Sequence, residues 1–150
     1  LAASYGSLTH FYDYRNLELL FVIENICSLS WSGDSKKFVC VENYSNIAIY
    51  HNENDRFVKK YFYPLEKAYS VDWAKSSDSP HPAILCCVKI EDTQDPYAYK
   101  ILLFDEKLES SHRFLRSYSD RMTAAWMSNG LDIVYTWQNE LSIRRAISNF

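Results

Sequence analysis

The sequence predicts an all-β fold in which a four-stranded antiparallel sheet is repeated along the chain. Aromatic residues make up 16% of the 150 residues, with 12 Tyr, 8 Phe and 4 Trp, and this enrichment favours strands over helices. Short apolar runs alternate with polar turns throughout the chain, which is the pattern of buried and half-buried strands. A run that ends in tryptophan recurs at Trp31, Trp73 and Trp126, so the strands fall into cycles.

The first cycle covers residues 1–24 and is incomplete. Residues 1–7 predict a strand that closes on a turn containing Gly6. Leu8–Asp13 leaves neither of its faces purely polar, as expected for a strand that is packed on both sides. After a polar turn, Leu17–Glu24 is predicted as the next strand.

The second cycle covers residues 25–63 and is the most regular. It predicts, in order, a strand ending at Trp31, a polar turn at 32–36, a strand at Lys37–Glu42, a strand ending at Tyr50, a polar turn at His51–Arg56 and a strand at Phe57–Tyr63. Pro64 is expected to end the last strand because proline has no backbone donor for a sheet.

Two further cycles cover residues 68–118 and 121–150, the second of them incomplete. The strands of the third cycle are predicted at Ala68–Ala74, Ala83–Ile90, Lys100–Asp105 and within Leu108–Tyr118. Those of the fourth are predicted at Arg121–Met127, Leu131–Trp137 and Glu140–Ala146. Two long polar loops lengthen the third cycle, and the first of them contains two prolines.

The spacings indicate that the cycles repeat one unit. Trp31 and Tyr50 are 19 residues apart, and so are Trp126 and Arg145. A four-stranded unit of about 40 residues is typical of a β-propeller blade. Because one such sheet cannot cover its own apolar faces, neighbouring blades stack face to face around an axis. We therefore expect an incomplete propeller of about three and a half blades, with the remaining blades supplied by a longer parent chain or by a partner.

Around its tryptophans the chain resembles the WD-repeat β-propeller family. The matching residues are Leu29–Asp34 (LSWSGD), Val71–Trp73 (VDW) and Ala124–Trp126 (AAW), and the family's Trp-Asp dipeptide is matched by Tyr12-Asp13 and Phe104-Asp105. The family's Gly-His dipeptides are missing, and Asn139 is the nearest match to its loop aspartate. The resemblance implies a divergent propeller of the seven-bladed type. With the family's polar network largely missing, we expect aromatic and aliphatic packing to hold the blades together, with Trp31 packed between two of them.

Composition and motifs argue against several classes of function. The net charge of −3 does not suit a general binder of phosphate backbones, and no apolar run is long enough to span a membrane. The N-terminal residues lack the pattern of a secretory signal, and we expect an intracellular protein. The sequence contains neither a glycine-rich phosphate loop nor a GxSxG nucleophile motif, so we expect no enzyme activity, no catalytic residues and no cofactor.

The cysteines and histidines do not predict a metal site. Cysteines occur at 27, 40, 86 and 87, each within an apolar strand pattern, and no CxxC motif is present. The four histidines are scattered rather than placed at ligand spacing. We therefore predict reduced and mostly buried thiols and no bound metal.

Two charged groups allow a functional or a structural interpretation. Arg113, Arg116 and Arg121 interleave with Phe114 and Tyr118, so they could hold phosphates while the rings stack on bases. The simpler interpretation is an outer strand with alternating solvent and core faces. The acidic loop with Glu91, Asp92 and Asp95 could contact calcium or a basic partner, or it could be a solvated loop.

The remaining candidates for function are the loops that gather on one face of a propeller. Exposed tyrosines in such loops are of the type enriched at binding hot spots, although each could instead cap the core from the rim. The candidate partner-contact residues are Tyr44, Tyr63, Glu91, Asp92, Tyr97, Tyr118 and Arg121.

The function that the sequence predicts is that of a non-enzymatic scaffold. The chain would present its loop surfaces to other protein subunits in a multi-subunit intracellular complex. One alternative is the propeller domain of a larger enzyme, such as a prolyl-oligopeptidase-like peptidase. Another is a propeller subunit associated with nucleic acid.

Overall fold

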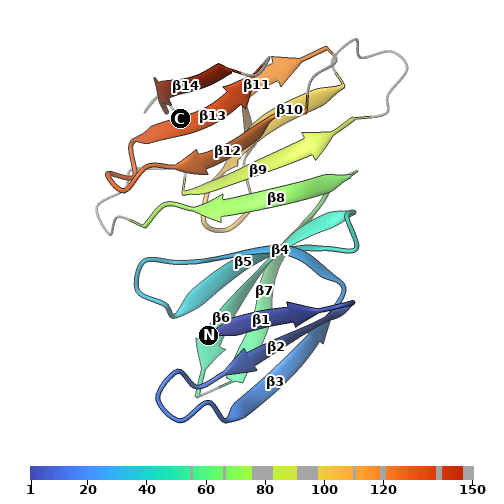
Figure 1. Ribbon diagram of the computed structural model, residues 1–150, viewed down its shortest axis with the longest axis vertical. Helices are drawn as coiled ribbons and strands as arrows, with labels where there is room; N and C mark the ends of the chain where they lie inside the picture. The colour runs from blue at the N-terminus through green and yellow to red at the C-terminus, as the bar shows by residue number, and fades with distance from the viewer. Residues whose placement is uncertain are drawn as a thin grey trace.

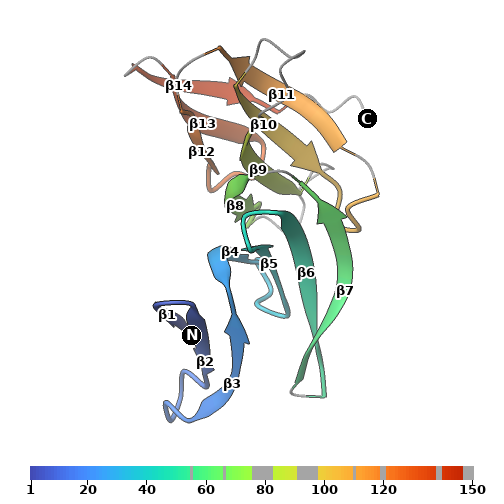
Figure 2. The ribbon, with the colours of Figure 1, turned by 90° about the vertical axis from the view of Figure 1, so that its right-hand side faces the viewer.

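The computed structural model describes residues 1–54, 56–65, 67–75, 83–90, 98–109, 111–118, 121–137 and 140–146. These residues form strands and turns only, arranged as four antiparallel sheets, which confirms the predicted all-β class. The sheets follow one another in chain order along the long axis of the molecule, from the N-terminal sheet to the C-terminal sheet (Figures 1 and 2). Within this part of the chain, no helix has the length and apolar character needed to cross a membrane.

Each sheet is a meander of consecutive strands. Sheet 1 contains β1 (Ala2–Tyr5), β2 (Leu8–Tyr12) and β3 (Leu19–Glu24). Sheet 2 contains β4 (Ile26–Trp31), β5 (Lys37–Glu42), β6 (Asn46–Glu53) and β7 (Arg56–Pro64). Sheet 3 contains β8 (Ala68–Trp73), β9 (Ile84–Lys89), β10 (Tyr99–Phe104) and β11 (Ser111–Ser117). Sheet 4 contains β12 (Thr123–Trp126), β13 (Asp132–Trp137) and β14 (Glu140–Arg145).

The structure corrects one boundary of the second cycle. The predicted polar turn over His51–Arg56 is wrong, because β6 continues to Glu53 and β7 already begins at Arg56. Glu53 and Arg56 face each other across the two strands, so both belong to the sheet rather than to a loop. The polar side chains of this segment had suggested a loop, but the outer strands of a sheet tolerate them because one face is solvated.

The core consists of three apolar layers, one between each pair of neighbouring sheets. Strand alternation explains this, because successive side chains point to opposite faces of a sheet. In β5, Phe38 and Cys40 pack toward sheet 1, whereas Val39 and Val41 pack toward sheet 3. These four side chains are fully buried, as their almost continuous apolar run requires.

Trp31 packs between two sheets, as predicted. Its ring meets Phe11 of sheet 1 edge-on at 6.1 Å between centroids, and it meets Phe38 and Phe57 of sheet 2 at 5.3 and 5.6 Å. Such edge-to-face geometry adds about 0.5–1.5 kcal/mol per pair beyond the burial of area. Trp31 is therefore a packing residue rather than part of a binding surface.

Hydrogen bonds also join the sheets, whereas the sequence had led us to expect packing alone. The Asp72 carboxylate of β8 accepts a hydrogen bond from the Ser30 hydroxyl of β4 at 2.8 Å. Its other oxygen accepts one from the backbone N–H of Trp126 in β12, also at 2.8 Å. One side chain therefore connects the first strands of sheets 2, 3 and 4.

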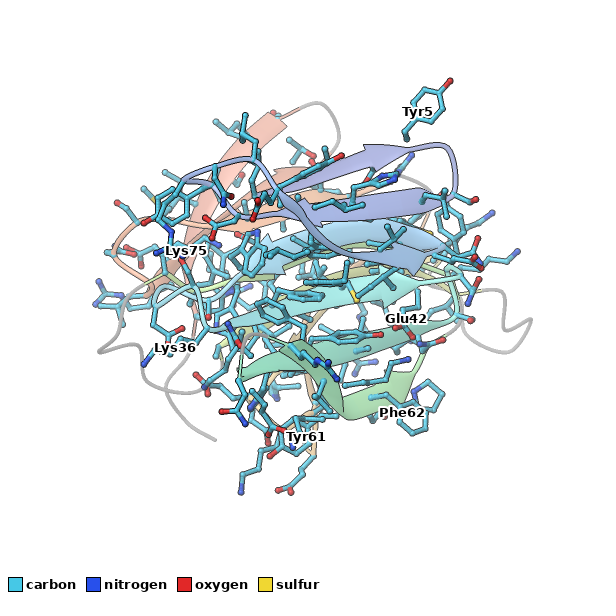
Figure 3. The ribbon with its side chains drawn as sticks, turned by 90° about the horizontal axis from the view of Figure 1, so that it is seen from below. Tyr5, Lys36, Glu42, Tyr61, Phe62 and Lys75 are labelled. Atoms are coloured by element: carbon cyan, nitrogen blue, oxygen red, sulfur yellow. The ribbon has the colours of Figure 1, made fainter. Side chains whose placement is uncertain are left out.

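The turns of the sheets lie at two opposite ends of the molecule. Figure 3 shows Tyr5, Glu42 and Phe62 on one side and Lys36 and Lys75 on the other. We call the first side the aromatic end and the second the opposite end, since the aromatic end carries the exposed rings described below.

Candidate protein-interaction surface

Exposed aromatic side chains at the aromatic end come from all four sheets, and they are spread across this end, with Tyr5 and Phe62 at opposite margins (Figure 3). Strands β1, β5, β7, β11 and β13 all run toward this end, because neighbouring strands are antiparallel and each sheet is a meander. The exposed side chains at or just beyond the ends of these strands have 42–86% of their surface accessible, and they are Tyr5, Tyr44, Phe62, Tyr118 and Trp137. Aromatic residues of this kind, large and with few rotamers, are favoured contacts in protein interfaces.

Backbone hydrogen bonds tie the turns of this end to one another. The N–H of Asn43 donates to the carbonyl of Asn25 at 2.9 Å, which fixes the turn after β5 against the link into sheet 2. The N–H of Leu65 donates to the carbonyl of Ser45 at 2.8 Å, which joins the exit of β7 to the same turn. The turn that carries Tyr44 is therefore held by backbone bonds on both sides.

Tyr44 occupies a strained backbone position. Asn43 and Tyr44 have φ angles of 52° and 55°, and the N–H of Ser45 donates to the carbonyl of Glu42 at 3.0 Å. This geometry is a type I′ turn, for which Asn-Gly is the preferred sequence. A bulky side chain at positive φ costs about 1 kcal/mol or more, so Tyr44 lowers the local stability of this turn.

The Tyr44 hydroxyl also has a specific neighbour. Side-chain hydrogen bonding with Cys27 raises the pKa of Tyr44. Cys27 is half-buried, whereas the other three cysteines are buried, and all four are free thiols. The predicted burial is thus confirmed for Cys40, Cys86 and Cys87.

Arg121 lies at the aromatic end and is held by a ring. Its guanidinium carbon lies 4.5 Å from the centroid of the Tyr69 ring, which is cation–π geometry. The Tyr69 hydroxyl donates to the backbone carbonyl of Met122, and burial raises the pKa of Tyr69. Arg121 is therefore an ordered positive charge beside the exposed rings.

The structure brings together some of the predicted partner-contact residues. Tyr44, Tyr118 and Arg121 all lie at the aromatic end. Tyr63 is half-buried instead, with its ring 5.2 Å edge-on from Phe104 in the layer between sheets 2 and 3. The other three candidates, Glu91, Asp92 and Tyr97, lie outside the described residues, as does Asp95 of the same loop.

Three exposed rings of this surface were not among the sequence candidates. Trp137 ends β13, Tyr5 ends β1, and Phe62 lies near the end of β7 between two half-buried tyrosines. Strand alternation could have identified Phe62, because its neighbours in a run of three aromatic residues must point to the other face. Tyr5 and Trp137 carry no such signal, since their exposure depends on which faces the neighbouring sheets cover.

The arginines considered for nucleic acid do not form one group. Arg121 lies over Tyr69 at the aromatic end, whereas Arg113 and Arg116 lie on the outer strand β11. The Phe114 ring packs beneath Arg144, at 5.6 Å from its guanidinium, and edge-on against Tyr135 at 6.3 Å. Phe114 is therefore not a free platform for stacking a base.

A serine, a lysine and an aspartate converge between sheets 2 and 3, but they form a structural group. The Ser30 hydroxyl donates to Asp72, and it accepts from Lys75 Nζ and from the N–H of Trp73, both at 3.0 Å. Burial lowers the pKa of Lys75. Because Ser30 is buried and its proton is directed to Asp72, this group is not arranged to attack a substrate. Within the described ranges no group of three or more His, Cys, Asp or Glu is placed to hold a metal.

Glu42 forms a buried polar network at the aromatic end. Its carboxylate accepts hydrogen bonds from the Tyr50 hydroxyl at 2.6 Å, from Asn46 at 2.8 Å and from Lys59 Nζ at 2.8 Å. Burial alone would raise the pKa of Glu42, but the bonds from Lys59, Tyr50 and Asn46 lower it below its ordinary value. The ionised carboxylate is therefore the form that the folded state favours.

We expect Glu42→Gln to lower the free energy of unfolding at neutral pH by about 1–3 kcal/mol. The variant's free energy of unfolding should also change less as the pH falls. A carboxyl whose pKa is lowered by folding stabilises the protein above its unfolded pKa, about 4.3, and this contribution is lost as the pH falls through the folded pKa. Urea unfolding between pH 7 and pH 3 measures both effects. Equal pH slopes for the parent and the variant would contradict this role, and Glu140→Gln, on an exposed strand end, is the control.

Comparison with known proteins agrees with this architecture at the level of fold. No protein-family model matches the sequence, and no curated protein matches it. The structure is similar over 93% of the chain to the β-propeller domain of Cps50 (Swd1) from Myceliophteria thermophila, with a TM-score of 0.67 and 12% identity. This chain has the fold of a β-propeller.

Two further solved propellers support the assignment. A chain of the Mitotic Checkpoint Complex matches 93% of this chain with a TM-score of 0.66 and 12% identity. TolB from Acinetobacter baumannii matches 92% with a TM-score of 0.64 and 13% identity. This chain spans 45%, 43% and 37% of the three matched chains, so its four sheets correspond to less than half of each. Identities this low show the fold alone.

Proposed function

We propose that this propeller segment is a non-enzymatic scaffold that binds a partner protein through its aromatic end. The observation that carries the proposal is the presence at this end of five exposed aromatic side chains, which come from four sheets. Such a surface buries much area at a low cost in side-chain entropy, which is how rigid aromatic anchors stabilise interfaces. Arg121, fixed over Tyr69, adds an ordered charge that can select an acidic group of the partner.

The strain at Tyr44 supports a role for this side chain, although seven other described non-glycine residues, among them Leu17 and Leu108, also have positive φ. A glycine at this position would suit the type I′ turn better, yet the chain has a tyrosine with most of its surface exposed. Strained residues of this kind cluster at functional sites. The fully packed strands beneath the turn provide a rigid base for the ring.

The finer part of the proposal concerns the assembly. The sequence resemblance supports a divergent WD-repeat propeller acting in a multi-subunit intracellular complex. Sheets 1 and 4 each leave apolar side chains exposed on their outer faces, among them Leu8 and Val22 in sheet 1 and Leu141 and Ile143 in sheet 4. Further blades, from the parent chain or from a partner, would cover these faces as sheets 2 and 3 cover each other. The alternative of an enzyme's propeller domain stays a prediction.

A binding comparison between the two ends tests the proposal. Three tagged proteins are compared: the parent chain, a Tyr44→Ser/Trp137→Ser variant, and a control variant at the opposite end, Tyr14→Ser/Lys36→Ser. Each is used to capture binding proteins, which are then quantified by mass spectrometry. We expect at least one protein to be retained by the parent and the control but reduced about tenfold with the aromatic-end variant. If all three proteins have the same thermal stability and capture the same proteins equally well, the aromatic end is not the binding surface.

Tyr44→Gly is expected to increase stability while it weakens partner binding. The change removes the cost of a side chain at positive φ, although glycine adds entropy to the unfolded chain, so the expected net gain is about 0.5–1 kcal/mol. Thermal or urea unfolding measures the gain, and the capture experiment measures the loss. A destabilised Tyr44→Gly variant would show that the ring contributes to folding rather than to recognition.

A further inference from the structure

The imidazole ring of His51 has a buried nitrogen without a hydrogen-bond partner. His51 lies in β6 and is half-buried as a residue, but its Nε2 atom is buried and meets no protein donor or acceptor among the described residues. The indole nitrogen of Trp126 shares this condition, but it does not titrate. Histidine ordinarily gains its charge at a pH of about 6.5. In mild acid, a proton can therefore reach a ring whose buried nitrogen has nothing to donate to.

The His51 side chain lies on the face of sheet 2 that packs against sheet 3. It is the register partner of Lys37 in β5, and side chains paired across two strands share one face. On this face, Lys37 Nζ bonds to Glu106, in the turn after β10, at 2.7 Å, and it lies 5.8 Å from the centre of the Trp73 ring of β8. Tyr61 of β7 meets the imidazole edge-on at 5.7 Å. The ion pair between Lys37 and Glu106 therefore joins sheets 2 and 3 on the same face as this histidine.

The charged side chains that act on His51 are already paired with one another. Lys37 is paired with Glu106 at 2.7 Å, and Lys60 of β7 is paired with Glu53 of β6 at 2.5 Å. Burial lowers the pKa of His51, and the two lysine charges act in the same direction, whereas the two carboxylates oppose them. The net direction is downward, so the folded state favours the neutral ring.

A proton on His51 would disturb the contact between the two sheets. The charged ring would lie beside Lys37, which repels it, and its buried N–H would have no acceptor among the described residues. A buried charge is tolerated when it is paired, and each carboxylate that acts on this ring already has a lysine. Pairing the imidazolium with Glu106 would therefore take that carboxylate from Lys37 and weaken the link to sheet 3.

We propose that His51 acts as an acid-sensitive latch between sheets 2 and 3, in which the neutral ring keeps the Lys37–Glu106 contact closed and protonation opens it. A histidine whose pKa is lowered in the closed state stabilises that state above its ordinary pKa of about 6.5, and this contribution is lost as the pH falls. If the ring of the opened state titrates at about 6.5, opening becomes about tenfold more favourable at pH 5.5 than above pH 7. The hydrogen bonds of Asp72 do not involve His51, so the opening is local.

The turn after β10 is the segment that reports the opening. Glu106 lies within it, and the N–H groups of Lys107 and Glu109 donate to the Asp105 carboxylate at 3.0 Å. The N–H of Leu108 donates to the Asp105 carbonyl at 3.2 Å. Leu108 has a φ of 59° and is only 3% exposed, because its side chain packs into the layer between sheets 2 and 3. Release of Glu106 should therefore expose these amides to exchange with solvent.

Two NMR measurements on the full 150-residue chain test the latch. The first follows the ring protons of His51 against pH, and we expect a pKa below 6.5. The second compares hydrogen-exchange protection factors at pH 7.5 and pH 5.5, which corrects for the intrinsic effect of pH on exchange. We expect protection of residues 107–109 to fall about tenfold, while β4 and β8 keep theirs. His51→Phe should abolish this fall, whereas His112→Phe, on the exposed strand β11, should retain it.

Several results would overturn the proposal. A His51 ring that titrates at 6.5 or above would show that the folded state does not favour the neutral form. The same fall in protection in the His51→Phe variant would assign the acid effect to another group. If that variant does not fold, His51→Gln takes its place with the same expectation, because glutamine does not titrate. Equal loss of protection in all four sheets would indicate global acid unfolding rather than a local latch. The latch uses none of the residues of the aromatic end, so a failure of the proposed function would leave these results unaffected.

Discussion

Asp72→Ala is expected to destabilise the chain by about 3 kcal/mol, a large part of the 5–15 kcal/mol typical of a folded domain. The carboxylate accepts hydrogen bonds from Ser30 at 2.8 Å, from the N–H of Trp73 at 3.0 Å and from the N–H of Trp126 at 2.8 Å. The N–H of Trp73 keeps Ser30 as a second acceptor, but the N–H of Trp126 loses the partner that the structure gives it. A buried donor left without an acceptor costs about 1–3 kcal/mol. The contacts of sheet 3 with sheet 2 and with sheet 4 also weaken together.

Urea unfolding of three variants separates this effect from the loss of a charge. Asp72→Asn keeps one acceptor oxygen and should cost less than Asp72→Ala. Asp132→Ala removes a strand aspartate bonded to exposed partners, and it should cost below about 1 kcal/mol. In a double-mutant cycle with Ser30→Ala, we expect a coupling energy of about 1 kcal/mol. A coupling near zero, or equal losses at positions 72 and 132, would show that the three sheets are not joined through Asp72.

This junction shows where the sequence is informative about the fold. The tryptophan that ends a strand in each cycle is visible along the chain, and β4, β8 and β12 do end at Trp31, Trp73 and Trp126. The bonds of Asp72 could not be read in the same way, because its partners lie 42 and 54 residues away and meet only when the sheets stack. Periodicity fixes strands and their repeat, whereas contacts between sheets depend on the rotation of one sheet against the next.

The candidate site likewise contains some residues that the sequence predicts and others that it does not. Loop position identified Tyr44, Tyr118 and Arg121, since turns of a meander return to the same end of each sheet. The exposure of Trp137 and the burial of Tyr63 against Phe104 depend on how far a neighbouring sheet extends over a strand end. That distance follows from packing in three dimensions and leaves no local pattern.

Gly33→Ala is expected to destabilise the chain by about 2–3 kcal/mol through a clash between two backbones. A Cβ at this position would lie 2.2 Å from the carbonyl oxygen of Lys75 and 3.0 Å from its carbonyl carbon. The Lys75 backbone cannot withdraw easily, because its side chain donates hydrogen bonds to Ser30 and to the carbonyl of Trp31. The turn after β4 and the exit of β8 are thus held together at a spacing that only glycine permits.

Gly6→Ala is the matched control for this prediction, measured by the same thermal and urea unfolding. Gly6 has a φ of 60°, but no atom lies within 4 Å of the position its Cβ would take. Its replacement should therefore cost only the backbone strain of about 1 kcal/mol. If Gly33→Ala costs no more than Gly6→Ala, sheets 2 and 3 can separate at the opposite end without penalty. A larger cost at Gly33, accompanied by faster hydrogen exchange in β8, would show that the contact between turns helps to hold the two sheets in register.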